Sequence, residues 1–309
     1  MINSVTQINE YAKNPKKLIE IGEKDYVSEI TAVAKRISDN DDIKIVALAG
    51  PSGSGKTTSA HILCEKLETM GEKTTIVSLD DFYLEADKLP LLPDNTKDLE
   101  SVHSLNIPLI RECFYNIIKT GKAYIPKFDF KSGKSIPNAK QVDITGRGII
   151  IVEGLHALNP IITDLVPKEN IFKIYISVNC SILDAFGEQL LSSRQIRLAR
   201  RSLRDSVFRG YPVEQTLSLW NKVIDGERKY LYCHKSSADA HIKTLHIYEP
   251  CVYRDSFLKL KQQINKGTPC YEYFMRTADA LEKFCSISDE FIPDSSLVRE
   301  FIGKGKYKY

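Results

Sequence analysis

Short apolar segments rich in β-branched residues recur through the middle of the chain, separated by stretches with helical spacing. Four of these segments lie at residues 43–50, 74–79, 148–154 and 171–178. Because they are almost continuously apolar, we expect strands that are buried on both faces, as in a parallel sheet between helices. The pattern therefore predicts an α/β protein whose parallel sheet has helices on both faces.

Helical spacing dominates on either side of this region. Apolar side chains in residues 15–40 recur with a mostly helical period, and the helical pattern returns after residue 255. We therefore divide the chain into an N-terminal helical segment (1–39), a catalytic body (40–265) and a C-terminal helical extension packed on that body (266–309).

The stretch between the second and third apolar segments differs from both patterns. It contains a probable helix at residues 104–120, followed by the sequence AYIPKFDFKSGKSIPN at residues 123–138. The latter predicts an inserted β-hairpin that turns at Ser132-Gly133. A hairpin inserted at this point is a natural wall for a substrate site.

Residues Gly50–Thr57 read GPSGSGKT and match the phosphate-binding motif G-x-x-x-x-G-K-[ST]. The motif follows an apolar segment and precedes a helical sequence, which is the context it requires. Glycines let backbone N–H groups curve round phosphate oxygens, Lys56 reaches the β- and γ-phosphates, and the Thr57 hydroxyl can ligate Mg²⁺. The alternative, a glycine-rich turn that binds nothing, is disfavoured by this context. The predicted ATP-binding residues of the loop are Gly50, Gly53, Ser54, Gly55, Lys56, Thr57 and Thr58.

Acidic residues close two of the predicted strands. Asp80 and Asp81 follow residues 74–79, and Glu153 lies at the end of residues 148–154. The carboxyl ends of parallel strands point into the ligand crevice, where Asp80 can accept the proton of an attacking hydroxyl. An Asp pair that only caps the next segment is the alternative. Together with Thr57, Asp80 and Glu153 form the predicted metal site.

Residues 194–209 place six arginines within about four helical turns. Arg197, Arg200, Arg201 and Arg204 follow the i, i+3, i+4, i+7 spacing of one helix face. Such a face can act as a lid that stabilises the transferred phosphoryl group, as a solvated surface, or as a nucleic-acid patch. Because it follows the phosphate-binding loop and both acids, we favour a helical lid at about residues 190–212.

Composition narrows the class of protein. The 309 residues have a net charge of only +3, and the seven cysteines are scattered without metal-ligand spacing. The chain contains neither an apolar stretch of membrane-spanning length nor a signal-peptide core. We therefore expect a cytoplasmic protein with no nucleic-acid or membrane partner; a homo-oligomer remains open.

The motifs GPSGSGKTT, SLDDFY, IPKFDFKSGK, IIIVEG and RLARRSLRD, in this order, resemble those of the uridine kinase and phosphoribulokinase family. The chain is most similar to bacterial nucleoside kinases whose kinase half follows domains like those of threonyl-tRNA synthetase. This resemblance implies a Rossmann-like P-loop NTPase fold, ATP as the phosphoryl donor with Mg²⁺, and the 5′-hydroxyl of a nucleoside such as uridine or cytidine as the acceptor.

The resemblance also implies roles for individual residues. Asp80 matches the catalytic base, and Thr57 and Glu153 match metal-associated positions. Tyr83 matches an aromatic residue beside the nucleoside, and Glu100 stands where uridine kinases place a ribose-binding Asp. The arginines that match lid positions are Arg197, Arg200, Arg201 and Arg204. We assign catalysis to Asp80, Lys56, Arg197 and Arg200, ATP binding also to Arg201 and Arg204, and substrate binding to Tyr83, Glu100, Phe128 and Arg197.

The predicted hairpin departs from the family. It lacks the His that uridine kinases place there to face the base, although Phe128 can stack on a ligand or belong to the core. Three hypotheses follow, in decreasing order of preference. The protein is a nucleoside kinase, a kinase of another small hydroxyl acceptor such as a sugar phosphate or hydroxy acid, or a non-catalytic ATP-binding protein with a regulatory or RNA-associated role.

Overall fold

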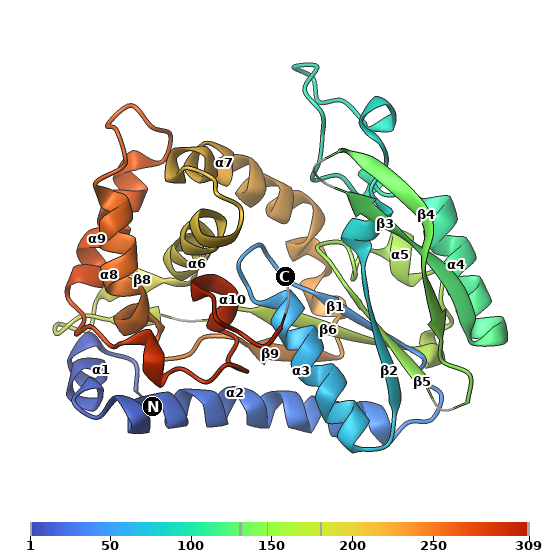
Figure 1. Cartoon of the computed structure of the whole chain (residues 1–309), viewed down its shortest axis with the longest axis horizontal. Coiled ribbons are helices and arrows are strands. Elements are labelled where there is room, and N and C mark those ends of the chain that lie inside the picture. Colours follow the sequence, from blue (N-terminus) through green and yellow to red (C-terminus); the bar gives the residue numbers. More distant parts are fainter. Residues whose placement is uncertain (1, 130–131, 147, 180, 308–309) are drawn as a thin grey trace.

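The computed structural model describes residues 2–129, 132–146, 148–179 and 181–307. At its centre is a five-stranded parallel sheet in the order β2-β5-β1-β6-β9 (Figure 1). The strands are β1 (Ile45–Ala49), β2 (Lys73–Ser78), β5 (Gly148–Glu153), β6 (Ile171–Ser177) and β9 (Ala240–Lys243). The four predicted strands are confirmed, whereas the short edge strand β9 was not predicted.

Side chains of the sheet alternate between two hydrophobic clusters, one on each face. In β1, Val46 belongs to one cluster and its neighbour Ile45 to the other. The helices that contribute to the first cluster include α2 (Pro15–Ser38) and α3 (Lys56–Thr69), and those of the second are α4 (Ile107–Thr120) and α5 (Pro160–Thr163). The predicted α/β architecture, with helices on both faces of a parallel sheet, is confirmed.

The position of β1 creates the crevice. Its two neighbours are β5 and β6, so the chain leaves the centre of the sheet in opposite directions on either side. In open α/β sheets ligands bind at such a switch point, outside the carboxyl ends of the strands. The phosphate-binding motif follows β1, and the acids follow β2 and end β5, so all of them lie at this edge.

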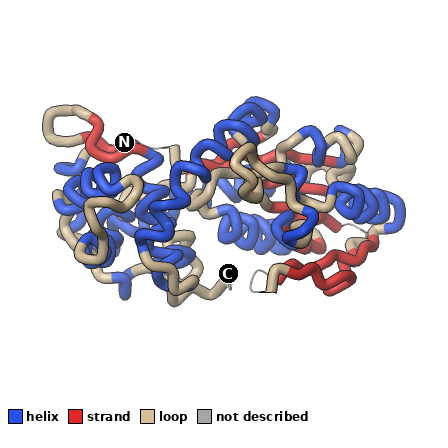
Figure 2. The backbone as a smooth tube through the Cα atoms, turned by 90° about the horizontal axis from the view of Figure 1, so that it is seen from above, coloured by secondary structure: helices blue, strands red, loops and turns tan. Residues whose placement is uncertain are grey.

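The inserted hairpin is present as an antiparallel pair, β3 (Lys122–Asp129) and β4 (Lys134–Asp143). A second, smaller hairpin consists of β7 (Ser181–Leu183) and β8 (Gln189–Ser192), and it was not predicted. Figure 2 shows the two hairpins at opposite ends of the molecule.

Helices make up most of the remainder. They are α1 (Val5–Ala12), α6 (Ser193–Phe208), α7 (Val213–Tyr230), α8 (Glu249–Lys261), α9 (Tyr271–Glu282) and α10 (Arg299–Ile302). One hydrophobic cluster includes Ile8, Val46 and Phe274, which come from the three predicted parts of the chain. The N- and C-terminal helices thus share a continuous core with the body. Among the described helices, none is both long and apolar enough to cross a bilayer.

Candidate active site

The loop after β1 has the conformation that phosphate binding requires. Gly53 and Gly55 have φ angles of +72° and +85°, in the left-handed region that favours glycine. A Cβ atom on Gly50 would lie 2.6 Å from the side chain of Ile176, so β6 approaches too closely for any other residue. Lys56 Nζ donates to the carbonyl of Gly50 at 3.0 Å. The structure therefore brings the predicted loop residues together at the N-terminus of α3.

The N-terminus of α3 also contacts the C-terminal segment of the chain. Its N-cap is Gly55, which has no side chain to accept a hydrogen bond from the first turn. Glu300 of α10 supplies the acceptor, because its Oε2 accepts from the Thr58 backbone N–H at 3.3 Å and from Thr58 Oγ1 at 2.6 Å. Leu297 lies against Gly55, whose added Cβ would come within 2.5 Å of it. Figure 1 shows α10 beside the start of α3.

Asp80 follows β2 and Glu153 ends the neighbouring strand β5, and one hydroxyl contacts both residues. Ser78 Oγ donates to Glu153 Oε1 at 2.7 Å and accepts from the Asp80 backbone N–H at 3.3 Å. Burial raises the pKa of Glu153 to about 7, the negative Asp80 adds to this increase, and Lys56 opposes it. The acids are therefore close enough to repel each other, and the positive charge of Lys56 favours the charged form of both.

Asp80 is accessible although protein surrounds it. Its side chain is open to solvent, yet enough water is displaced for burial to raise its pKa, against the opposing charges of Lys56, Arg209 and Arg204. The exposure means that an acceptor hydroxyl can reach Asp80, as a general base requires.

The donor atoms of this site suit Mg²⁺. Thr57, Asp80 and Glu153 offer hard oxygen ligands, and a bound cation would relieve the repulsion between the acids. Within the described ranges there is no group of three or more His, Cys, Asp or Glu that could form a metal cage. Mg²⁺ commonly takes only one or two carboxylates and completes its shell with phosphate oxygens and water, so these residues fit it.

The β3–β4 hairpin lies beside the Asp80 segment. The Phe128 backbone N–H donates to Asp81 Oδ1 at 3.4 Å, and the rings of Tyr83 and Phe128 are 5.9 Å apart between centroids, tilted by 50°. The Tyr83 hydroxyl donates to the carbonyl of Leu99 at 2.9 Å, which fixes the loop before Glu100. The structure thus gathers the predicted acceptor-side aromatic residues next to Asp80.

Glu100 lies within electrostatic range of Asp80 and of Arg201, which contacts the phosphate-binding loop. Burial raises its pKa to about 7, Arg201 opposes the increase, and Glu227 and Asp80 add to it. The predicted sugar-binding acid, the predicted base and an arginine of α6 are therefore close together. A cluster of carboxylates at this position favours hydrogen bonding to hydroxyl groups over binding of an anion.

The arginine face of α6 is buried against the phosphate-binding loop. Arg200 is fully buried, pairs with Glu249 at 2.6 Å and donates to the carbonyl of Gly53 at 3.1 Å. Arg197 forms an ion pair with Glu227 and contacts the loop. In this structure both guanidiniums neutralise buried carboxylates, and the catalytic roles predicted for Arg197 and Arg200 and the substrate binding predicted for Arg197 stay predictions. The two arginines brace the loop, and in this structure α6 is a packed helix.

The other two predicted arginines lie nearer the crevice. Arg201 Nη1 donates to Ser52 Oγ at 2.8 Å, and Arg204 pairs with Asp205 at 2.8 Å. Arg209, to which the sequence assigned no role, contacts Asp205 at 3.5 Å and acts on the charge of Asp80. Arg204 and Arg209 are therefore the arginines whose positive charges act on the pKa of the predicted base, Asp80.

Sequence reasoning missed the acids that hold these arginines. Glu227 and Glu249 accept from Arg197 and Arg200 across 30 and 49 residues, so no local motif links them. The arginine stripe was the available signal. Guanidiniums buried against a loop require carboxylate partners, and a packed helix face would have predicted them.

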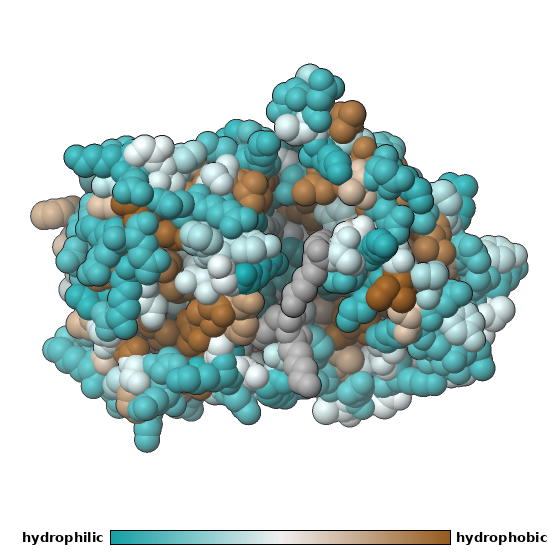
Figure 3. Space-filling view, turned by 45° about the horizontal axis from the view of Figure 1, so that its top comes forward, coloured by the Kyte–Doolittle hydropathy of each residue, from teal (hydrophilic) through white to brown (hydrophobic). Residues whose placement is uncertain are grey.

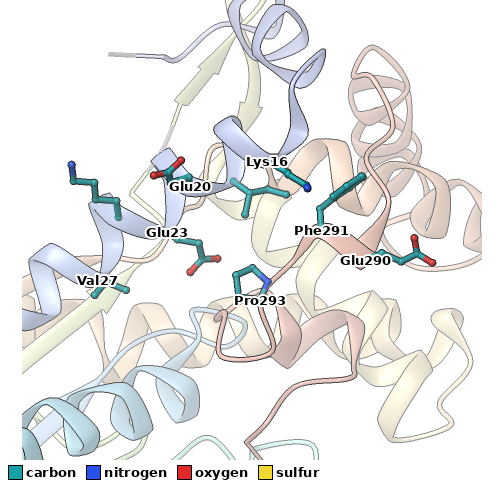
Figure 4. Close-up of a pocket in the computed structure, with 9 residues that line it drawn as sticks. Lys16, Glu20, Glu23, Val27, Glu290, Phe291 and Pro293 are labelled. Atoms are coloured by element: carbon teal, nitrogen blue, oxygen red, sulfur yellow. The ribbon is translucent and has the colours of Figure 1, made fainter.

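One face of the molecule is hollowed. In the space-filling view the face is recessed near its centre, between the helical half of the molecule and the half with the sheet and hairpin (Figure 3). A separate groove of about 680 Å³ lies between α2 and the C-terminal segment (Figure 4). The residues lining this groove include Glu20, Glu23, Phe291 and Pro293, and none of them belongs to the predicted site.

The sheet order, the loop after the central strand and the acids on adjacent strands define a P-loop nucleotide-binding protein. The sequence model of the phosphoribulokinase / uridine kinase family matches residues 45–249. The chain belongs to this family.

Individual relatives are distant. The uridine kinase of Schizosaccharomyces pombe is 28% identical over 184 residues, 59% of this chain and 36% of that protein. Uridine kinase-like protein 5 of Arabidopsis thaliana is 25% identical over 181 residues, 58% of this chain and 34% of that protein. The chain thus spans about a third of the length of these curated relatives. A solved D-glycerate 3-kinase from Cryptococcus neoformans superimposes with a TM-score of 0.43 and 18% identity, covering 66% of this chain and 86% of that chain.

Proposed function

We propose that the protein is an ATP- and Mg²⁺-dependent kinase that phosphorylates a hydroxyl group of a small molecule, with the 5′-hydroxyl of a nucleoside such as uridine or cytidine as the leading acceptor. The observation that carries this proposal is the arrangement of Asp80, Glu153 and Lys56. The Ser78 hydroxyl contacts the carboxylate of the buried Glu153 and the backbone of the accessible Asp80, and the charge of Lys56 acts on both acids.

Each group has a task in phosphoryl transfer. The loop N–H groups and Lys56 hold the phosphates of ATP, and Asp80 accepts the proton of the attacking hydroxyl. Bound Mg²⁺, held by Thr57 and the acids, would neutralise charge on the phosphates. Arg204 lies within electrostatic range of Asp80, which places positive charge near the transferred group.

Two observations support a nucleoside acceptor. Relatives carry the name uridine kinase, and the acceptor side offers Glu100 beside the aromatic pair Tyr83 and Phe128. Carboxylates bind the hydroxyl groups of a sugar, and aromatic rings stack on a base. An acceptor with its own phosphate or carboxylate would meet like charge at Glu100.

The test compares Asp80→Asn with Asp81→Asn in a coupled assay of ADP release. The panel contains nucleosides, sugar phosphates and hydroxy acids, with acceptor-free ATPase activity as the blank. We expect Asp80→Asn to lower kcat by roughly a thousandfold, because the base is lost, with little change in ATP affinity, because Lys56 and the loop N–H groups still hold the phosphates. Asp81 accepts a hydrogen bond from the Phe128 backbone N–H, and the side-chain oxygen of Asn can accept the same bond. Asp81→Asn should therefore retain turnover.

The panel separates the alternatives. Turnover of sugar phosphates or hydroxy acids, with none of nucleosides, would reject the nucleoside and keep the kinase. ATP binding without transfer to any acceptor, together with RNA binding that weakens steeply with salt, would support the non-catalytic alternative. Normal rates for Asp80→Asn would show that another group is the base.

A further inference from the structure

Three groups from α6 and α7 hold Ser52, the third residue of the phosphate-binding loop. Its backbone N–H donates to Glu227 Oε1 at 2.8 Å, its carbonyl accepts from Arg197 Nε at 2.8 Å, and its hydroxyl accepts from Arg201 Nη1 at 2.8 Å. Glu227 is fully buried. One loop residue is therefore fixed through its backbone and its side chain by two helices that follow it far along the chain.

Glu227 is itself held in place. Its Oε2 accepts from the Tyr232 hydroxyl at 3.0 Å, and the same hydroxyl accepts from Arg197 Nη1 at 3.2 Å. The Arg197 guanidinium lies 5.6 Å from the centre of the Trp220 ring. We call Ser52, Arg197, Glu227 and Tyr232 the joint. Its hydrogen bonds link these residues around one buried carboxylate, and such a fully satisfied network has a fixed geometry.

The residue before Glu227 lies against the acceptor side. A Cβ atom on Gly226 would come within 2.7 Å of Glu100 Cβ and 2.9 Å of its Cγ. The absence of a side chain at position 226 therefore allows Glu100 to occupy its place. Four residues further on, Tyr230 donates from its hydroxyl to Asp98 Oδ2 at 3.1 Å, so α7 contacts this loop twice.

We propose that Gly226 and Glu227 set the spacing between the two substrates. Glu227 is a positioning residue for the ATP side, because it holds Ser52 of the phosphate-binding loop. Gly226 is a positioning residue for the acceptor, because it defines how far Glu100 can approach α7. Consecutive residues of one helix are about 1.5 Å apart along its axis, and their side chains point in different directions. A single rigid helix can therefore hold both sites at a fixed distance from each other.

The inference rests on the proposed phosphoryl transfer. The reacting atoms of the donor and the acceptor must be held about 3–3.5 Å apart, and a displacement of about 1 Å can lower the rate roughly a hundredfold. A helix that contacts both sites through adjacent residues fixes this distance without touching either reacting atom. The consequence is that changes at 226 and 227 should affect different kinetic constants.

Gly226→Ala tests the acceptor half. The added methyl group forces Glu100 away, and we expect the acceptor KM to rise about tenfold while the ATP KM changes less than about twofold. Alanine favours a helix over glycine by about 1 kcal/mol, so helix propensity does not weaken the fold. Gly267→Ala is the control, since within the described part of the chain its added methyl would meet no atom within 4 Å.

Glu227→Gln tests the donor half. The amide keeps the shape and an acceptor for Ser52, but it removes the charge opposite Arg197. We expect kcat to fall about tenfold, with the acceptor KM within about twofold of the original enzyme. If this variant does not fold, Tyr232→Phe removes one hydroxyl from the joint, keeps the ion pair, and should shift kcat in the same direction by a smaller factor.

The split between the two constants is the decisive result. The inference is overturned if both variants change the same constant, if neither changes one, or if losses only follow a lower melting temperature. Crystal structures of the variants give a readout that does not need turnover: Glu100 moves and Ser52 stays for Gly226→Ala, and the reverse holds for Glu227→Gln. An active wild type without this split rejects the inference, whereas a wild type inactive with every acceptor rejects the proposed function.

Discussion

Arg200 supports the phosphate-binding loop from a fully buried position. It forms two hydrogen bonds with Glu249 and donates to the Gly53 and Thr244 carbonyls. Burial and the pairing with Arg200 have opposite effects on the pKa of Glu249, and the net result is a lowered value of about 2. The carboxylate therefore stays charged at neutral pH, and Arg200 contributes more than His246 to balancing its charge.

We predict that Arg200→Met lowers the free energy of unfolding by about 3–5 kcal/mol, because it removes the guanidinium that pairs with a fully buried carboxylate. Urea unfolding followed by circular dichroism measures this change. Arg228→Met is the matched control: its pair with Asp225 is exposed, and its loss should cost less than about 1 kcal/mol. Equal effects for the two variants would show that Arg200 contributes no more than a surface arginine.

At the scale of elements, the sequence predicted those strands and loops whose formation depends on neighbouring residues. The apolar runs identified β1, β2, β5 and β6, and the motif at Gly50–Thr57 identified the loop between β1 and α3. The arginine spacing identified α6. It did not show which groups the arginine face contacts, because Glu227 and Glu249 come from other helices. Such partners become neighbours only through tertiary packing, which residue spacing does not encode.

The C-terminal segment is the clearest case of a non-local contribution. Glu300 reaches the N-terminus of α3 from 242 residues away along the chain. It accepts from the Thr58 N–H, which the sequence had assigned to phosphate. Further along, Tyr307 stacks on His61 of α3 at 4.9 Å between ring centroids, and Lys306 pairs with Glu65 at 2.9 Å. A short helix at the chain end thus places a carboxylate at the phosphate-binding N-terminus.

We predict that Glu300→Gln strengthens ATP binding about three- to tenfold. A carboxylate beside the loop repels the phosphates, whereas an amide keeps the hydrogen bond without the charge. Calorimetric titration of ATP without acceptor measures the Kd. Glu65→Gln is the control, because it removes an acid on α3 that pairs with the same C-terminal segment. Weaker ATP binding by Glu300→Gln would mean that the charge is needed to shape the loop.

At the scale of the whole molecule, a buried chain of charges connects the N-terminal helix to the phosphate-binding loop. His246 lies 3.7 Å from Glu23 of α2 and 3.6 Å from Glu249 of α8, which in turn pairs with Arg200 of α6. Tyr248 donates to Glu23 and contacts Ser296 of the C-terminal segment at 3.0 Å. The predicted N-terminal and C-terminal segments are therefore tied to the body through charge as well as through apolar packing.

This network gives stability a dependence on pH. Burial by itself would lower the pKa of His246, but Glu23 and Glu249 together raise it to about 9. A histidine whose pKa is raised on folding contributes stability that is complete below its ordinary pKa, and the contribution is lost as the pH rises through the folded value. The loss should therefore extend from about pH 6.5 to about pH 9.

We predict that the free energy of unfolding falls by about 2–3 kcal/mol between about pH 6.5 and pH 9.5, and that His246→Gln removes most of this slope. The variant should be less stable than the original protein at about pH 6, where it lacks the cation between two carboxylates, and nearly equal to it at about pH 9.5. Buried cysteines ionise on unfolding at alkaline pH in both proteins, so the difference between the two urea-unfolding curves isolates the histidine. Parallel pH profiles would show that His246 stays neutral in the fold, and the charge of Glu23 would then have to be balanced by another group.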